Sequence, residues 1–178
     1  NDTADYYKFR VTSDSLLQFN LSGTNNNPNL QLLNSSGRSI SGFNSINIAQ
    51  GVTAGTYYLL VSPNFAVGQN NGTNYQLNTA ITPITDFAGS NNQTARDIGT
   101  LSGARSLTDF VGNIDYSDFY RFELKEKSTF NLNFNPERPS NANSISLTNS
   151  QGQWLTSTNG NSISQELDAG IYYTQIYN

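Results

Sequence analysis

The chain has 178 residues, of which only 12% are charged, and its formal net charge at pH 7 is −4. It contains no cysteine and no histidine, which excludes disulfide bonds, thiol chemistry and histidine as a general base or metal ligand. The acidic balance argues against nucleic acid as a partner, because such binding needs a basic face. The sequence contains no run of about 18 apolar residues, so it does not predict a segment that inserts into a membrane.

Ten tyrosines and ten phenylalanines can build a core, whereas runs of helix-forming residues are absent. The stretch DYYKFRV at Asp5 to Val11 alternates apolar and polar positions, as a half-buried strand does. Further short alternating runs follow around Leu17 to Leu21, Leu30, Ile48, Tyr57 to Val61 and Tyr75 to Thr79. Short strands separated by turn signals are typical of a β-sandwich or barrel, so we predict an all-β protein.

The same order of strands then begins again. DFYRFEL, at Asp118 to Leu124, repeats the first stretch 113 residues further along, and DAGIYY, at Asp168 to Tyr173, repeats TAGTYY from Thr53 at a spacing of 115. A two-residue insertion in an Asn-rich loop explains the change in spacing. The glycines that precede each Tyr-Tyr pair, Gly55 and Gly170, are expected in turns at positive φ.

The repeat divides the chain into two modules. We predict a first module at residues 1–82, a linker at 83–93 and a second module at 94–178. Residues 91–114 are expected to hold two more short strands, which have no counterpart before the first copy. The first module is therefore expected to lack N-terminal strands, and the second to lack the last strand.

The second copy resembles the bacterial pre-peptidase C-terminal domain in its cyanobacterial-type form. The residues that carry this resemblance are Asn92 to Leu101, Asp109 to Leu124, Leu147 to Leu155 and Leu167 to Tyr173, and the first copy shares it from Asp2 to Ile81. The resemblance implies tandem jelly-roll-like antiparallel β-sandwich modules, which are not catalytic and belong to secreted or cell-surface proteins. Related sandwiches in collagenases bind calcium or the substrate polymer.

Pairs of aspartates precede the repeated strand in both copies. Asp2 and Asp5 in the first copy, and Asp115 and Asp118 with Asn113 in the second, offer the oxygen atoms that calcium prefers as ligands. The alternative is structural, because an aspartate before a strand also caps a turn by accepting backbone N–H groups. The sequence leaves both interpretations open.

Three aromatic side chains are candidates for a binding surface. In each Tyr-Tyr pair one ring should face outward, and we assign this position to Tyr58 and Tyr173, which could stack on a sugar or simply suit a strand. Trp154 aligns with Ser39 of the first copy, so it is expected outside the shared core. It is either a binding anchor or an exposed residue on a strand edge.

The function expected from these features is non-catalytic: an extracellular module that acts as a spacer, in adhesion or in secretion, with calcium as a candidate ligand. One alternative is a module that binds a polysaccharide or another extracellular polymer. The other is a structural subunit of a filament or surface layer, in which neighbouring modules or identical chains complete each other's sheets by strand exchange.

Overall fold

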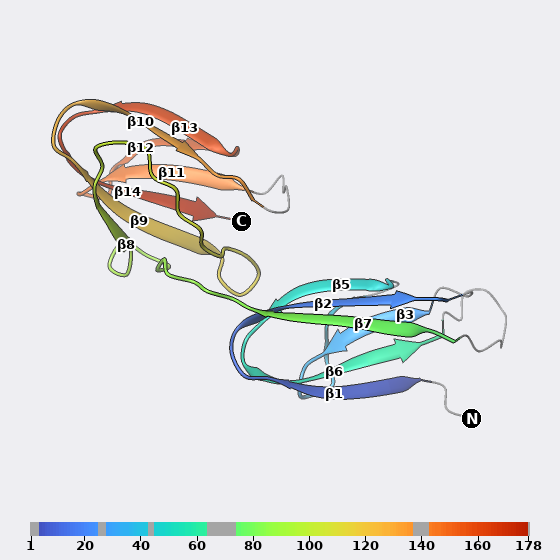
Figure 1. Ribbon diagram of the computed structural model, residues 1–178. Coiled ribbons are helices and arrows are strands. Elements are labelled where there is room, and N and C mark those ends of the chain that lie inside the picture. The colour runs from blue at the N-terminus through green and yellow to red at the C-terminus, as the bar shows by residue number, and fades with distance from the viewer. Residues whose placement is uncertain (1–3, 25–27, 43–44, 64–73, 137–142, 178) are drawn as a thin grey trace. The chain divides into compact units, whose positions relative to one another are not determined.

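The computed structural model describes residues 4–24, 28–42, 45–63, 74–136 and 143–177. Within these ranges the chain forms strands and no helix, so the predicted all-β class is confirmed (Figure 1). The chain divides into two compact units, Asn1–Ile84 and Thr85–Asn178, which we call unit 1 and unit 2. No helix of the described part is long and apolar enough to cross a membrane.

Unit 1 consists of two antiparallel sheets with one core between them. The first sheet has the order β1 (Asp5–Val11), β6 (Gly55–Ser62), β3 (Asn29–Leu33) and β4 (Ser39–Ser41). The second has the order β5 (Asn47–Val52), β2 (Ser15–Ser22) and β7 (Gln76–Pro83). Both sheets contribute to the buried core, whose members are Val11, Leu17, Phe19, Leu21, Leu30, Leu32, Ile48, Val52, Tyr57, Leu59 and Val61.

Unit 2 repeats this arrangement with different edges. Its larger sheet has the order β12 (Trp154–Thr158), β11 (Ser144–Asn149), β14 (Gly170–Tyr177), β9 (Ser117–Leu124) and β8 (Arg96–Thr100), and β8 runs parallel to β9. Its smaller sheet pairs β10 (Ser128–Asn133) with β13 (Ser162–Leu167). At the centre of the core, the Phe122 ring stacks on Phe130 at 4.5 Å and on Tyr172 at 5.7 Å between ring centroids.

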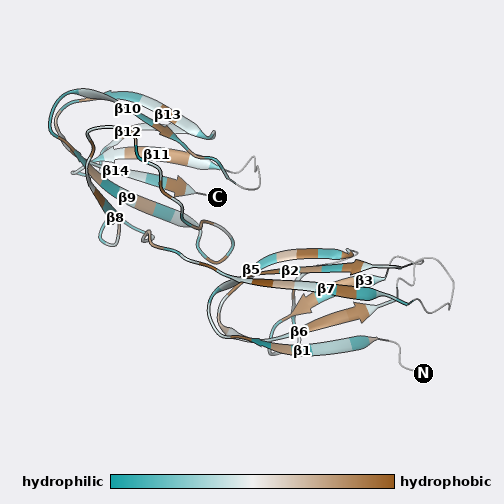
Figure 2. Ribbon diagram, viewed as in Figure 1, coloured by the Kyte–Doolittle hydropathy of each residue, from teal (hydrophilic) through white to brown (hydrophobic). Residues whose placement is uncertain are grey.

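Alternation of side chains explains why these segments are strands. Along β9 every second residue is buried, and β2 shows a similar period. Figure 2 shows hydrophobic and hydrophilic bands along the strands of both units. Because successive side chains of a strand point to opposite faces, one face of each sheet is apolar and the other is polar. These are the segments in which the sequence shows the clearest two-residue period.

The pairing registers of the two units coincide under the same spacings as the sequence repeat. Phe9 pairs with Tyr57 in unit 1, as Phe122 pairs with Tyr172 in unit 2. The units differ at two edges. In unit 1 the strand β7 covers one edge of β2, whereas no described strand covers the corresponding edge of β10 in unit 2. In unit 2 the strand β8 covers one edge of β9, whereas no described strand covers the corresponding edge of β1 in unit 1. The finer jelly-roll assignment remains a prediction.

The region between the two modules differs from the expectation. Residues 83–93 were expected to be a linker, but Pro83 ends β7 and the residues from Thr85 onward belong to unit 2. Gly89 forms a bridge with Phe119 of β9, whose N–H donates to the Gly89 carbonyl at 2.8 Å. Of the two short strands expected within 91–114, the structure has one, β8, followed by irregular chain.

The prediction for the two glycines before the Tyr-Tyr pairs is wrong. Gly55 and Gly170 are the first residues of β6 and β14 and do not have positive φ. Each following tyrosine instead folds back across its glycine: Tyr57 donates to the Thr53 carbonyl at 2.8 Å, and Tyr172 to the Asp168 carbonyl at 2.9 Å. A Cβ added at either glycine would lie 3.4 Å from the nearest atom of that tyrosine, which is an ordinary van der Waals contact.

Candidate metal centre

A short turn and the start of β9 position two of the predicted aspartates. Gly112 and Asp115 exchange two backbone hydrogen bonds, of 2.6 and 3.1 Å, and so close a tight turn directly before β9. Asp118 is the second residue of β9, where the alternation of the strand points its side chain inward. Only 2% of Asp118 is exposed.

A third carboxylate, that of Asp86, lies in the segment that was expected to be a linker. The bridge between Gly89 and Phe119 holds residues 86–89 beside β9. Asp109 fixes the same segment, because its Oδ1 accepts the Phe87 N–H at 2.8 Å while its Oδ2 pairs with the Arg96 guanidinium at 3.0 Å. The Arg96 guanidinium also lies 4.8 Å from the centre of the Phe87 ring. Together these contacts bring Asp86 to the start of β9.

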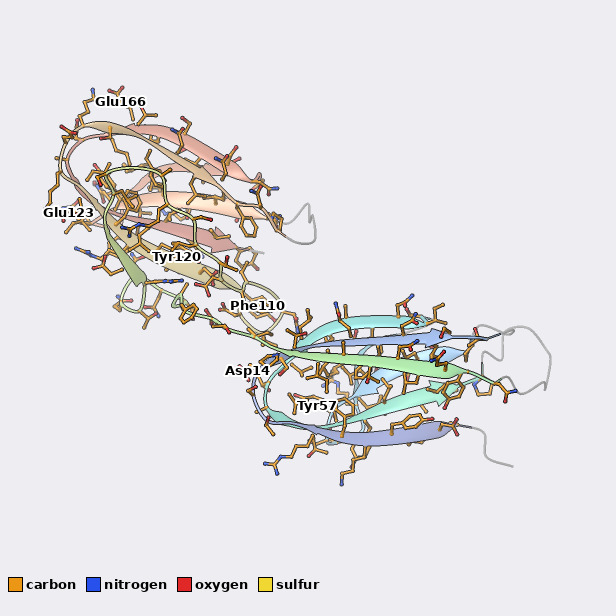
Figure 3. All side chains as sticks on the ribbon, viewed as in Figure 1. Asp14, Tyr57, Phe110, Tyr120, Glu123 and Glu166 are labelled. Atoms are coloured by element: carbon orange, nitrogen blue, oxygen red, sulfur yellow. The ribbon has the colours of Figure 1, made fainter. Side chains whose placement is uncertain are left out.

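Asp86, Asp115 and Asp118 form one acidic cluster. Each contributes an oxygen atom, and these atoms all lie within 4.8 Å of one another. The exposed Asp86 lies at its rim, Asp115 is half-buried, and Asp118 is buried. Tyr120, labelled in Figure 3, donates from its hydroxyl to Asp118 Oδ2 at 3.3 Å. Within the described part of the chain, Asp118 Oδ1 and Asp115 Oδ2 are buried and have no hydrogen-bond partner.

Ionisation of this cluster is electrostatically unfavourable. Burial raises the pKa of Asp118 to about 8, and the neighbouring carboxyl of Asp115 and the charges of Asp115, Asp109 and Asp86 act in the same direction. Burial also raises the pKa of Asp86, with a further contribution from the charge of Asp115. Carboxylates packed together in this way need a proton or a cation between them.

The donor set suits a hard cation. Calcium and magnesium both take carboxylate and carbonyl oxygens, and calcium accepts six to eight of them in flexible geometry. The buried oxygens of Asp118 and Asp115 that have no partner fit this chemistry. Asp109 does not need to be a ligand, because Arg96 and two backbone N–H groups already bond it.

The other predicted ligands have different surroundings. Asp2 lies outside the described residues. Asp5 accepts a hydrogen bond of 2.5 Å from the Tyr75 hydroxyl, which also lies 2.6 Å from the Tyr7 hydroxyl. Burial and the bond to Asp5 raise the pKa of Tyr75, so this group remains a donor. Asn113 lies with an exposed side chain in the turn between Gly112 and Asp115.

The sequence did not indicate Asp86 and Asp109 as residues of the site. Both occur in the same tripeptide, Thr-Asp-Phe, at residues 85–87 and 108–110. This repeated tripeptide was the available signal in the sequence, because it lies outside the main repeat. The tripeptide does not stand out by itself, because neither of its aspartates is next to a clearly alternating stretch of sequence.

The predicted aromatic residues lie on the outer faces of the larger sheets. Trp154 is 67% exposed on β12 and pairs with Thr148, which on its other side pairs with Tyr173. The half-buried Tyr173 borders an open hollow together with Arg121 and residues of the 92–95 and 150–152 loops. Tyr58 has the equivalent place in unit 1, where the Lys8 ammonium lies 5.9 Å from the ring centre.

Comparison of the chain with known proteins found no matching family model and no similar curated protein.

Proposed function

We propose that the chain is a non-catalytic tandem β-sandwich module of an extracellular protein, a spacer whose unit 2 is stiffened by calcium. The observation that carries the calcium assignment is the buried Asp118, with an unpartnered oxygen, beside the carboxylates of Asp115 and Asp86. The resemblance to the pre-peptidase C-terminal domain supports the extracellular, non-catalytic part. The lack of histidine and cysteine supports it as well.

Calcium would act as a clamp between two parts of unit 2. Asp86 comes from the segment before β8, whereas Asp115 and Asp118 belong to the entry into β9. A cation bound by all three would fix that segment to the sheet and remove the repulsion between the carboxylates. Such a site is useful in a spacer, because a stiffer module transmits its orientation to what it connects.

A thermal melt tests this proposal. We expect millimolar calcium to raise the melting midpoint of unit 2 by several degrees over the value in EDTA, because a ligand of the native state stabilises it by mass action. The fluorescence of Trp154, the single tryptophan of the chain, reports on unit 2 alone. Magnesium serves as the comparison cation.

Matched variants separate a bound ion from a general salt effect. Asp118→Asn and Asp86→Asn should abolish the calcium response. Asp168→Asn, which makes the same charge change at an exposed position of unit 2, and Asp5→Asn in unit 1 should keep it. The same midpoint in calcium and in EDTA for the unsubstituted protein would refute the calcium site.

A second candidate function, polysaccharide binding, is favoured by the row formed by Trp154, Thr148 and Tyr173. Adjacent strands are about 4.8 Å apart, so the two aromatic residues lie about 10 Å from each other, a span comparable to that of two sugar units. The polar groups around the hollow beside Tyr173 could bond sugar hydroxyls. In unit 1 the equivalent row reads Ser39, Leu33 and Tyr58.

Affinity electrophoresis in gels that contain a polysaccharide tests this candidate. Trp154→Ala should abolish any retardation, because a stacked aromatic ring carries much of the energy of such a contact. Tyr58→Ala, at the equivalent row without tryptophan, is the control and should leave retardation unchanged. If no polysaccharide retards the protein, or if Trp154→Ala is retarded equally, the candidate is rejected.

A further inference from the structure

The free edge of β10 is the place where unit 2 differs most from unit 1. The strand β2 of unit 1 has β5 on one side and β7 on the other, and its pairing with β7 extends from Ser15–Pro83 to Ser22–Gln76. Its counterpart β10 pairs with β13 in the equivalent register, but no described strand pairs with its other edge. The outward side chains of β10 are uncharged, without the lysines that often protect an exposed edge.

Burial of the inward-facing side chains shows what the missing neighbour does. In unit 1, Leu17, Phe19 and Leu21 of β2 are between 0% and 4% exposed. At the equivalent positions of unit 2, Phe130 is 8% exposed, and Leu132 and Phe134 are only half-buried. The side chains at these positions of unit 2 are thus less well covered than their counterparts in unit 1.

Unit 1 also shows the chemistry of the covering strand. The side chains of Tyr75, directly before β7, and of Leu77, its second residue, pack against the core. On the outer face, Asn78 donates to Asn20 Oδ1 at 3.2 Å, and Asn20 donates in turn to Asn47 Oδ1 at 2.6 Å. The counterpart of Asn20 is Asn133, which pairs with Ser162 and occupies the last position of β10.

One further group in unit 2 matches the same strand. In unit 1 the Tyr75 hydroxyl donates to Asp5 and lies beside Tyr7. The counterparts of these two residues are Asp118 and Tyr120, and Asp118 Oδ1 has no partner among the described residues. A tyrosine that enters unit 2 as Tyr75 enters unit 1 would therefore meet an available acceptor.

We infer that the β10 edge is a binding site for an antiparallel strand of the β7 type. Its occupant is an uncharged extended segment with tyrosine and leucine two residues apart, followed by asparagine, as in Tyr75, Leu77 and Asn78. The leucine lies opposite Phe134 and the asparagine opposite Asn133, in the register that β7 has with β2. The inference depends on edge pairing and apolar burial, but the hydroxyl of the entering tyrosine would use Asp118, which also belongs to the proposed calcium site. The test is therefore made in EDTA, so that its outcome does not depend on a bound cation.

An extended chain tests the inference. Tyr177 corresponds to Ser62 and Asn178 to residue 63, so a second copy of residues 64–83 appended after Asn178 places β7 in the equivalent position. In EDTA, we expect the midpoint followed by Trp154 to rise by about 5 °C or more relative to a chain with a control extension. Hydrogen exchange at the backbone amides of β10 should slow in parallel.

The control extension has the same length and carries Tyr75→Asp and Leu77→Asp in the appended copy only. Equal midpoints and equal β10 exchange for the two extended chains would overturn the inference. Light scattering on the 178-residue chain is the second measurement, and a monomer is the expected result. A dimer whose β10 amides are already protected would also overturn the inference, because the occupant would then be a second copy of the chain.

Discussion

Asp118 couples the stability of unit 2 to pH. Its pKa in the folded unit is raised to about 8, chiefly by burial, whereas the ordinary pKa of an aspartate is 3.8. The folded state therefore holds a proton that the unfolded chain has lost over the range between these two values. Stability from this group is fully present below about pH 4 and is lost as the pH rises through about 8.

This dependence can be measured in EDTA, with Asp118→Asn as the reference that cannot ionise at this position. We expect the midpoint of the unsubstituted protein to fall relative to that of Asp118→Asn as the pH increases from about 4 to 8. Calcium should reverse the trend, because protons compete with the ion for the same oxygens. Parallel midpoint curves for the two proteins would show that Asp118 ionises normally.

At the scale of elements, the segment between β7 and β8 positions Asp86, and Gly89 is its critical residue. A Cβ added at Gly89 would lie 2.0 Å from the Thr94 carbonyl oxygen, so the segment must move to accommodate any side chain. We expect Gly89→Ala to displace Asp86 and to reduce calcium affinity by about tenfold or more. A calcium titration followed by the thermal midpoint of unit 2 measures the effect.

Gly103→Ala is the matched control for this experiment, because an added Cβ at Gly103 would meet no atom within 4 Å. This variant should bind calcium as the unsubstituted protein does. If Gly89→Ala also keeps full affinity, then Asp86 is not a ligand and the site must consist of Asp115, Asp118 and other groups.

The elements differ in how far the sequence could predict them. The strand β9 is evident from the alternation of Tyr120, Phe122 and Leu124, because burial on one face imposes that period. Asp115 and Asp118 were identified through their repeat in the first copy. Asp86 could not be placed, because its position depends on a backbone bridge between Gly89 and Phe119 that no local pattern encodes.

At the scale of the whole molecule, the two units differ in the strands that lie at the edges of their sheets. Unit 1 has sheets of four and three strands, and unit 2 has sheets of five and two, among the described residues. Six strands are common to both, and β7 and β8 each occur once. Superposed by their repeat, the two units define a module of five and three strands.

The repeat was detectable from sequence because strand order and spacing are preserved. The difference in burial between Phe19 and its counterpart Leu132 was not detectable, because it depends on whether a neighbouring strand is present. The sequence predicts that some sheet edges lack a neighbouring strand, but it does not indicate which side chains are only half-buried at those edges.

The hydroxyl of Tyr120 lies 3.3 Å from Asp118 Oδ2, so a luminescent ion bound in the acidic cluster would have an aromatic ring close to it. A phenol ring that is excited in the ultraviolet can transfer energy to a luminescent lanthanide ion bound within a few ångströms. Terbium prefers the same hard oxygen ligands as calcium, so an ion held by Asp118 would emit green light through Tyr120 as its antenna. Tyr120→Leu would leave the carboxylates in place and reduce the intensity of the terbium emission. The loss of intensity would locate the ion beside Tyr120 without a crystal structure.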